Sequence, residues 1–197
     1  MTLHALFLPS PVGRLTLVAH DRGLVAILWE NDRPSRVPLG PLTENPAHPI
    51  LQETVRQLNE YFAGKRRTFS LPLDPTGTPF QKAVWNALSA IPYGETRSYS
   101  QIAEHVGRPA AVRAVGAANG RNPLSIVVPC HRVVGANAQL TGFAGGLPVK
   151  AYLLALESRV VSGGGIRLRD KSSGSPSQNL SEPSSRTAVI VRSSSKQ

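Results

Sequence analysis

The chain has very little cysteine, because Cys130 is the only one among its 197 residues. A single thiol cannot close an intramolecular disulfide or provide the several thiolate ligands of a zinc cage. Such cysteine usage is typical of reducing compartments, so we expect a cytoplasmic protein. The composition, with 41% hydrophobic and 17% charged residues, allows an ordinary packed core.

Long apolar runs and cofactor motifs are also missing. No segment approaches the roughly 20 apolar residues of a membrane span, and the apolar start lacks the basic region and cleavage site of a signal peptide, so we expect no membrane partner. There is no glycine-rich phosphate loop and no dinucleotide fingerprint. The histidines are scattered along the chain, at His4, His20, His48, His105 and His131. We therefore expect no cofactor and no metal.

The net charge of +10 favours an anionic partner, of which nucleic acid is the commonest. Half of this charge lies beyond Ser158, in a stretch rich in serine and glycine. We expect residues 158–197 to form a disordered tail, either simply solvated or adding nonspecific attraction to phosphates. The remaining chain is only mildly basic, so charge alone does not identify a DNA-binding protein.

Residues 1–75 predict a small α/β domain. Three apolar runs have the character of strands, and the last two flank a hairpin turn; they cover residues 3–8, 14–19 and 24–29. A proline-rich loop follows. Apolar residues then recur at helical spacing from Ile50 to Phe62, and Gly64 is placed to end that helix.

Residues 78–157 predict a second, mostly helical domain. Two capping boxes, beginning at Thr78 and Ser98, start helices that extend to about Ala90 and Val106. After a break at Gly107, a third helix over residues 110–119 completes a helix-turn-helix pattern. A final helix is predicted over residues 148–157. The expected fold class is α/β (α+β): a small strand-and-helix domain followed by a helix-turn-helix domain.

The only thiol stands in a reactive sequence context. Cys130 ends an apolar run and is followed by His131 and Arg132. A free thiol, with a pKa of about 8.5, needs a base to remove its proton or a positive charge to stabilise its thiolate, and these two neighbours offer both. In an extended chain Cys130 and His131 would point apart, so they touch only if the chain turns after Pro129, and otherwise a water must connect them. The pattern favours a nucleophile over a buried core cysteine.

The predicted helix over residues 110–119 carries one long side chain, Arg113, among alanines and glycines. Such a surface lets the backbone approach another molecule closely, and the arginine could reach into that molecule. Tight packing between helices, with Arg113 in solvent, explains the pattern equally well. Both interpretations stay open from periodicity alone.

The run Pro129-Cys130-His131-Arg132-Val133 closely resembles the O6-alkylguanine-DNA alkyltransferases. The same resemblance includes three further segments, which are residues 116–119, Asn122-Pro123 and residues 142–146. The segments 78–81 and 91–96 are similar to the bacterial branch of that family. The resemblance is strong over residues 78–157, loose over the first 75 residues and absent from the tail.

The resemblance implies a protein that is a monomer in solution and binds duplex DNA. Its helix over residues 110–119 would lie in the narrow minor groove, with contacts from Ala114, Gly116 and Ala117. Arg113 would enter the base stack in place of the damaged base, and Tyr99 would press on the adjacent phosphate. The base must leave the stack because the O6 atom is closed to a thiolate inside it.

The resemblance also implies roles at the thiol. His131 would act as base through a water, with Glu157 orienting its imidazole, and Tyr99 would donate a proton to the leaving guanine. The carbonyls of Cys130 and Val133 would accept hydrogen bonds from the exocyclic amine of the base. Further pocket and supporting residues would be Phe143, Ala144 and Asn122, the last holding the turn before the active-site strand.

The resemblance implies that the alkyl group is transferred to Cys130 irreversibly. The thioether product offers no leaving group to water, so each molecule would repair one lesion. The preferred alkyl group, and whether O4-alkylthymine is also accepted, stay open. Phe143 stands where many relatives have tyrosine, which affects substrate range. The zinc site that some relatives build from cysteine and histidine cannot form with Cys130 alone.

Two other functions are alternatives to alkyl transfer for this sequence. A lesion-binding protein without transfer activity is the first, but relatives of that kind lack the cysteine. A cysteine hydrolase using Cys130 and His131 is the second, but such enzymes draw their histidine and asparagine from distant positions. The alkyltransferase is the function that the sequence favours.

Overall fold

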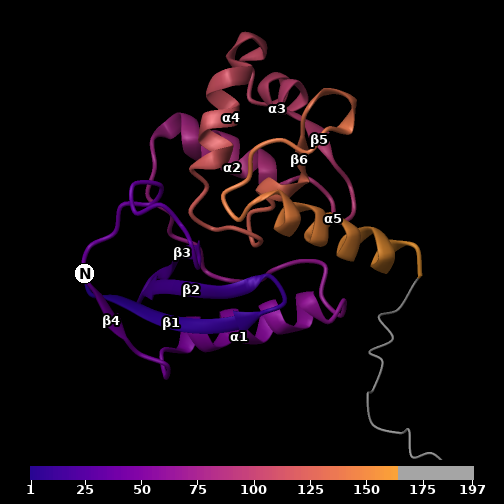
Figure 1. The fold of residues 1–197 in the computed structure, drawn as a ribbon. Helices are drawn as coiled ribbons and strands as arrows, with labels where there is room; N and C mark the ends of the chain where they lie inside the picture. Colours follow the sequence, from indigo (N-terminus) through magenta and orange to yellow (C-terminus); the bar gives the residue numbers. More distant parts are fainter. Residues whose placement is uncertain (164–197) are drawn as a thin grey trace, which may run out of the picture. The chain divides into compact units, whose positions relative to one another are not determined.

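The computed structural model describes residues 1–163, and its N-terminal part is a four-stranded sheet (Figure 1). Strands β1 (Leu3–Ser10), β2 (Gly13–His20) and β3 (Gly23–Trp29) are antiparallel, and β4 (Leu42–Glu44) pairs parallel to β1. The order across the sheet is β3-β2-β1-β4. The first three strands are confirmed. The sequence did not predict β4, because its three exposed residues have no alternating pattern.

The two faces of the sheet are covered differently. Leu15 and Leu17 point into the main core, whereas Val18 points to the opposite face, as alternation along a strand requires. Helix α1 (Pro49–Phe62) lies along the sheet, and Gly64 follows it with φ of 72°, confirming the predicted helix end. On the other face, part of the proline-rich loop packs against a small apolar cluster.

The helices of the second part follow their predicted caps. Helices α2 (Pro79–Ser89) and α3 (Tyr99–His105) both begin with complete capping boxes. Helix α4 (Val112–Gly120) starts later than predicted, because Pro109–Ala111 form a 3-10 turn that no side chain caps. The short strands β5 (Arg97–Ser98) and β6 (Val133–Val134) pair in parallel.

Helix α5 (Leu147–Val161) runs past the predicted end at residue 157. The prediction that the tail begins at Ser158 is therefore wrong for its first four residues. The helix continues because Val160 packs against the core, and it ends where Gly163 takes a φ of 76°. The predicted disorder of the later tail lies outside the described residues.

The two predicted domains share one apolar core. The same cluster of buried side chains includes Leu17 of the sheet and Leu153 of α5. The Ile27 amide also donates to the Pro123 carbonyl at 2.8 Å, and Trp29 packs against Phe143 with ring centroids 5.4 Å apart. The boundary between domains near residues 75–78 stays a prediction. Among residues 1–163, no helix combines the length and apolar character that a bilayer crossing needs.

Candidate active site

The chain turns at the cysteine. Cys130, His131 and Arg132 form one 3-10 turn (η2, Cys130–Arg132), so they do not follow an extended path. Just before it, the Asn122 side-chain amide donates to the Val128 carbonyl at 2.8 Å, and its oxygen accepts from the Leu124 amide at 3.0 Å. These bonds hold the segment that leads into the thiol.

Ile126, inside that segment, has a φ of 73° and is fully buried. A β-branched residue in this region costs on the order of 1–2 kcal/mol, which the surrounding contacts must offset. The approach to the thiol is therefore held in a strained conformation by its packing and by Asn122.

Glu157 of α5 is the centre of a buried hydrogen-bond network. Its Oε1 accepts from the Tyr61 hydroxyl at 2.7 Å, contacts His131 Nε2 at 2.8 Å and accepts from Arg132 Nη2 at 3.0 Å. Its Oε2 accepts from Arg132 Nε at 2.9 Å and from the Gly94 amide at 3.0 Å. Five hydrogen bonds from four residues satisfy a carboxylate that has no exposed surface.

The protonation states in this network follow from its contacts. Burial by itself would raise the pKa of Glu157, but the hydrogen bonds from His131 and Arg132, together with the positive charge of Arg132, outweigh it and lower that pKa to about 2. An ionised carboxylate only accepts, so His131 must carry its proton on Nε2. Burial lowers the pKa of His131 and keeps the imidazole neutral. Its Nδ1 then has a free lone pair, and this buried atom has no hydrogen-bond partner among the described residues.

The Cys130 thiol is buried, with 4% of the residue exposed. Burial raises the pKa of the Cys130 thiol, and the Asn122 side chain and the charges of Arg36 and Lys150 oppose this only in part. The resting thiol is therefore protonated and needs a base. No direct hydrogen bond joins it to His131, which leaves the water-mediated path that we expected. Arg132, expected as a source of charge for the thiolate, is instead paired with Glu157.

A separate surface is formed by the helix-turn-helix. Arg113, Ala114 and Ala117 of α4 are exposed, while the opposite side of the helix is buried. Gly116 faces the Tyr99 ring, so that a Cβ added there would lie 3.9 Å from two ring atoms. Tyr99 also lines an open groove of about 700 Å³ that reaches β6.

The predicted pocket residues are not all gathered in one cavity. Phe143 and Ala144 line a cavity of about 450 Å³ that also includes Arg36. Val133 does not line it, because this residue is fully buried and its carbonyl accepts from Lys150 Nζ at 2.6 Å.

Two domain families match the chain along most of its length. The DNA binding domain of 6-O-methylguanine DNA methyltransferase matches residues 79–159, and the ribonuclease-like domain of the same family matches residues 3–75. The chain belongs to this family.

Several relatives are similar over nearly their whole length. A methylated-DNA--protein-cysteine methyltransferase of Mycobacterium leprae is 51% identical over 161 residues, which are 81% of this chain and 94% of the relative. The protein of the same name from Methanosarcina acetivorans is 49% identical over 148 residues, covering 75% of this chain and 94% of the relative.

Solved structures agree with these matches. The O6-methylguanine methyltransferase of Mycobacterium tuberculosis has a TM-score of 0.71 and 48% identity, covering 80% of this chain and 93% of that one. The OGT of the same organism, solved in complex with DNA, has a TM-score of 0.72 and 46% identity, covering 81% of this chain and 94% of that one.

Three residues near the site were missed from the sequence. Lys150 donates to the carbonyls of Val133 and Thr141, at 2.6 and 2.9 Å. Arg36 pairs with Asp32 and donates to the Asn122 carbonyl. Lys150 had a usable signal, since it is a charge on the apolar face of its helix. Tyr61, and the bond from Arg36 to the Asn122 carbonyl, had none, because Glu157 and Asn122 are distant from them in sequence.

Proposed function

We propose that this protein repairs duplex DNA by moving the alkyl group of O6-alkylguanine to Sγ of Cys130, once per molecule. Family membership supports the reaction. The observation that carries the proposal is the buried thiol beside His131, whose Nε2 is fixed by Glu157 so that Nδ1 is left as a proton acceptor. This arrangement can activate a thiol whose own pKa is raised.

The proposed chemistry conserves atoms and protons. A water carries the thiol proton to His131 Nδ1, Sγ bonds to the alkyl carbon, and the bond from that carbon to O6 breaks. Tyr99 donates a proton toward the leaving guanine, which departs with the electron pair of the broken bond, and Tyr99 then regains a proton from water while His131 releases its proton to water. Glu157 stabilises the imidazolium that forms, because its carboxylate is already held ionised. The thioether has no group that water can displace, so Cys130 is consumed.

The DNA contact is proposed for the exposed side of α4. Ala114, Gly116 and Ala117 are small enough to let the helix backbone approach the minor groove. Arg113, which is exposed on the same helix, takes the space of the extruded base. Tyr99, whose ring packs near Gly116, contacts the phosphate beside the extruded nucleotide. One monomer acting on one flipped base is sufficient for this geometry.

The substrate contacts are proposed from the segments after the thiol. The Cys130 and Val133 carbonyls accept from the exocyclic amine of guanine, since a carbonyl that already accepts from Lys150 keeps a second lone pair. Phe143 and Ala144 lie in the loop that would cover the base. The proposal places the protein in the cytoplasm, because Cys130 must remain a free thiol.

The test is a stoichiometric transfer to one peptide. The full chain is incubated with a duplex containing one O6-methylguanine and then digested with trypsin. We expect one added methyl group on the peptide Asn122–Arg132, and no more than one methyl removed per protein molecule. An unmethylated duplex and the Cys130→Ala variant are the controls, and the variant should keep DNA affinity.

Two results distinguish the other functions considered. Binding to the damaged duplex with an unmodified Cys130 would indicate a lesion-binding protein. Release of many product molecules per protein would indicate a hydrolytic enzyme. Either result would overturn the proposed transfer.

A further inference from the structure

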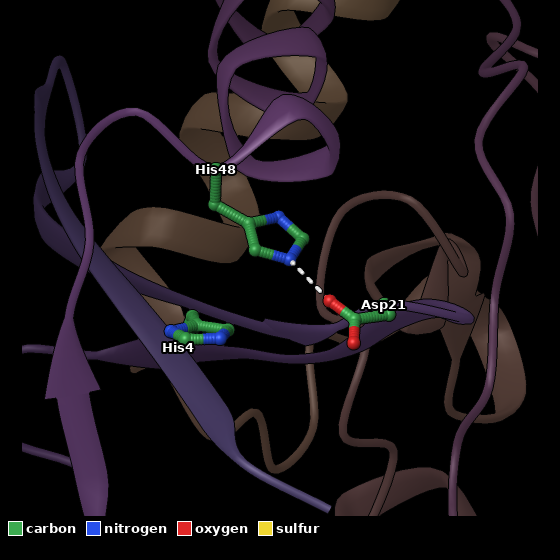
Figure 2. Close-up of side chains that lie close together, drawn as sticks. All are labelled: His4, Asp21 and His48. Atoms are coloured by element: carbon green, nitrogen blue, oxygen red, sulfur yellow. Dashed lines mark ion pairs between the residues drawn. The ribbon is translucent and has the colours of Figure 1, made fainter.

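Three potential metal ligands, none of them part of the site around Cys130, meet in the N-terminal part, and Figure 2 shows their side chains. His4 lies on β1, Asp21 in the turn between β2 and β3, and His48 just before α1. One ligand atom of each lies within 4.8 Å of those of the other two. His48 Nε2 is 3.7 Å from Asp21 Oδ1, and the two imidazole centroids are 5.0 Å apart.

The two imidazoles lack the partners that buried polar groups normally have. His48 is 5% exposed, and the Nδ1 atoms of His4 and His48 are both buried without a hydrogen-bond partner among residues 1–163. The great majority of buried polar atoms in proteins do have a partner, so each exception needs an explanation. The nitrogen of His48 that faces the carboxylate is the other one, Nε2, which lies 3.7 Å from Asp21 Oδ1, too far for a hydrogen bond. A cation shared by this Nε2, the Asp21 carboxylate and the His4 ring explains why the three groups lie together without bonding one another, while the His48 Nδ1 stays unpartnered.

We propose that His4, Asp21 and His48 bind a divalent transition metal of the zinc class. Two imidazoles and one carboxylate are a known zinc donor set, which leaves a fourth position for water. Imidazole ligands favour zinc, nickel or copper over magnesium or calcium. The three ligand atoms now lie up to 4.8 Å from one another. They must move closer, because a tetrahedral zinc ion with bonds of about 2.0–2.1 Å holds its ligand atoms roughly 3.3 Å apart.

That contraction is feasible because the exposed Asp21 side chain can rotate toward the metal. Its side chain is 97% exposed and stands in a hairpin turn, where side-chain rotation meets no packed neighbours. The buried His48 and the half-buried His4 would form the fixed part of the site. The bound ion would connect β1, the hairpin turn and the start of α1.

This site differs from the cysteine-containing zinc site that the resemblance gives to some relatives. Its ligands include no thiol, since Cys130 lies in the second part of the chain. It also revises our expectation of no metal. The histidines that are scattered in the sequence are partly gathered by the sheet and by α1.

The test measures zinc binding by titration calorimetry on the full chain. Because a thiolate also binds zinc, the Cys130→Ser variant serves as the parent protein. We expect one zinc per molecule in this parent. Adding Asp21→Asn or His4→Asn should weaken binding by about 10- to 100-fold or more, since ligand loss is at least as costly as loss of an outer-shell partner. His105→Asn, an exposed histidine on α3, is the matched control and should bind as the parent does.

A spectroscopic and a thermal measurement complete the test. Co²⁺ in the parent should give the intense visible bands of a four-coordinate ion, and these should be lost in His4→Asn. Zinc at about 100 times its dissociation constant should raise the melting temperature of the parent by about 5 °C or more, and that of His4→Asn by much less.

Three outcomes would overturn the proposal. These are no saturable binding by the parent, binding that Cys130→Ser abolishes, and binding unchanged by both ligand substitutions. Melting in EDTA checks that each variant is folded. If His4→Asn does not fold, Asp21→Asn decides, because an exposed turn residue can be replaced without loss of the fold. Alkyl transfer by Asp21→Asn should equal that of wild type, so failure of this site leaves the proposed function untouched.

Discussion

Replacing Glu157 by glutamine should damage both the stability and the reactivity of this protein. The carboxylate accepts five hydrogen bonds, two of them from Arg132. A glutamine of the same shape keeps one acceptor oxygen. The NH2 group that replaces the other oxygen is itself a donor, so it faces the remaining N–H or O–H groups without being able to accept from them. Arg132 is then left as a buried cation without its counterion.

The size of the effect follows from two separate arguments. Removing one partner of a buried ion pair costs about 3–5 kcal/mol. The pKa of Glu157 is lowered from 4.5 to about 2, which corresponds to about 3 kcal/mol of folding free energy. The two values agree. Because the folded pKa is the lower one, this contribution is complete above about pH 5 and is lost as the pH falls toward 2.

The assay is urea unfolding of wild type and Glu157→Gln between pH 7 and pH 2, together with the rate of methyl transfer. We expect the variant to be less stable by about 3–5 kcal/mol at pH 7, with the difference shrinking as the pH approaches 2. The transfer rate should fall by about 100- to 10,000-fold, since His131 loses the group that fixes its tautomer.

The matched control is Glu53→Gln, which changes an exposed carboxylate that also pairs with an arginine, Arg56. Exposed pairs contribute little, so this variant should resemble wild type. If Glu157→Gln unfolds like the control and keeps its transfer rate, the carboxylate is not the anchor of the site. A stability difference that stays constant down to pH 2 would contradict the assigned ionisation.

Three further predictions concern the DNA surface, the turn before the thiol and a helix cap. Arg113→Ala should slow transfer from duplex DNA while affecting transfer from free O6-alkylguanine much less; equal loss on both substrates would refute a role in base extrusion. Asn122→Ala leaves the Leu124 amide without its partner, while the Val128 carbonyl keeps the Cys130 amide as a donor, so urea unfolding should show a loss of about 1–3 kcal/mol, and transfer should be slower at unchanged DNA affinity. Ser98→Ala removes the cap of α3 and should lower the melting temperature by about 2–4 °C, whereas Ser100→Ala in the same turn should not.

The local pattern of the sequence predicted most helices and strands. Caps, periodicity and turns act over a few residues, so α1, α2, α3 and the first three strands could be found in this way. The errors occurred where local signals were absent. Strand β4 forms because β1 offers it an edge, and α5 continues past residue 157 because Val160 finds a place on the core.

The candidate site was predicted only in part. Cys130 and His131 stood out by their chemistry and Arg113 as the one long side chain of its helix, and the resemblance added Glu157 and Tyr99. No local pattern of residues indicated that Arg132 would turn from the thiol to Glu157. That choice is made by burial, because a buried carboxylate and a buried guanidinium each need a partner of opposite charge.

The sequence by itself determined that this chain carries one cysteine, in a context specific for alkyl transfer, and that the motif around it offers no way to regenerate the thiol. Only the tertiary structure decided which polar and charged groups come into contact. Tyr61 from α1 and Gly94 from a loop converge on Glu157, and His4 and His48 converge beside Asp21. Such contacts depend on how segments distant in sequence pack together, and no local pattern of residues specifies that packing.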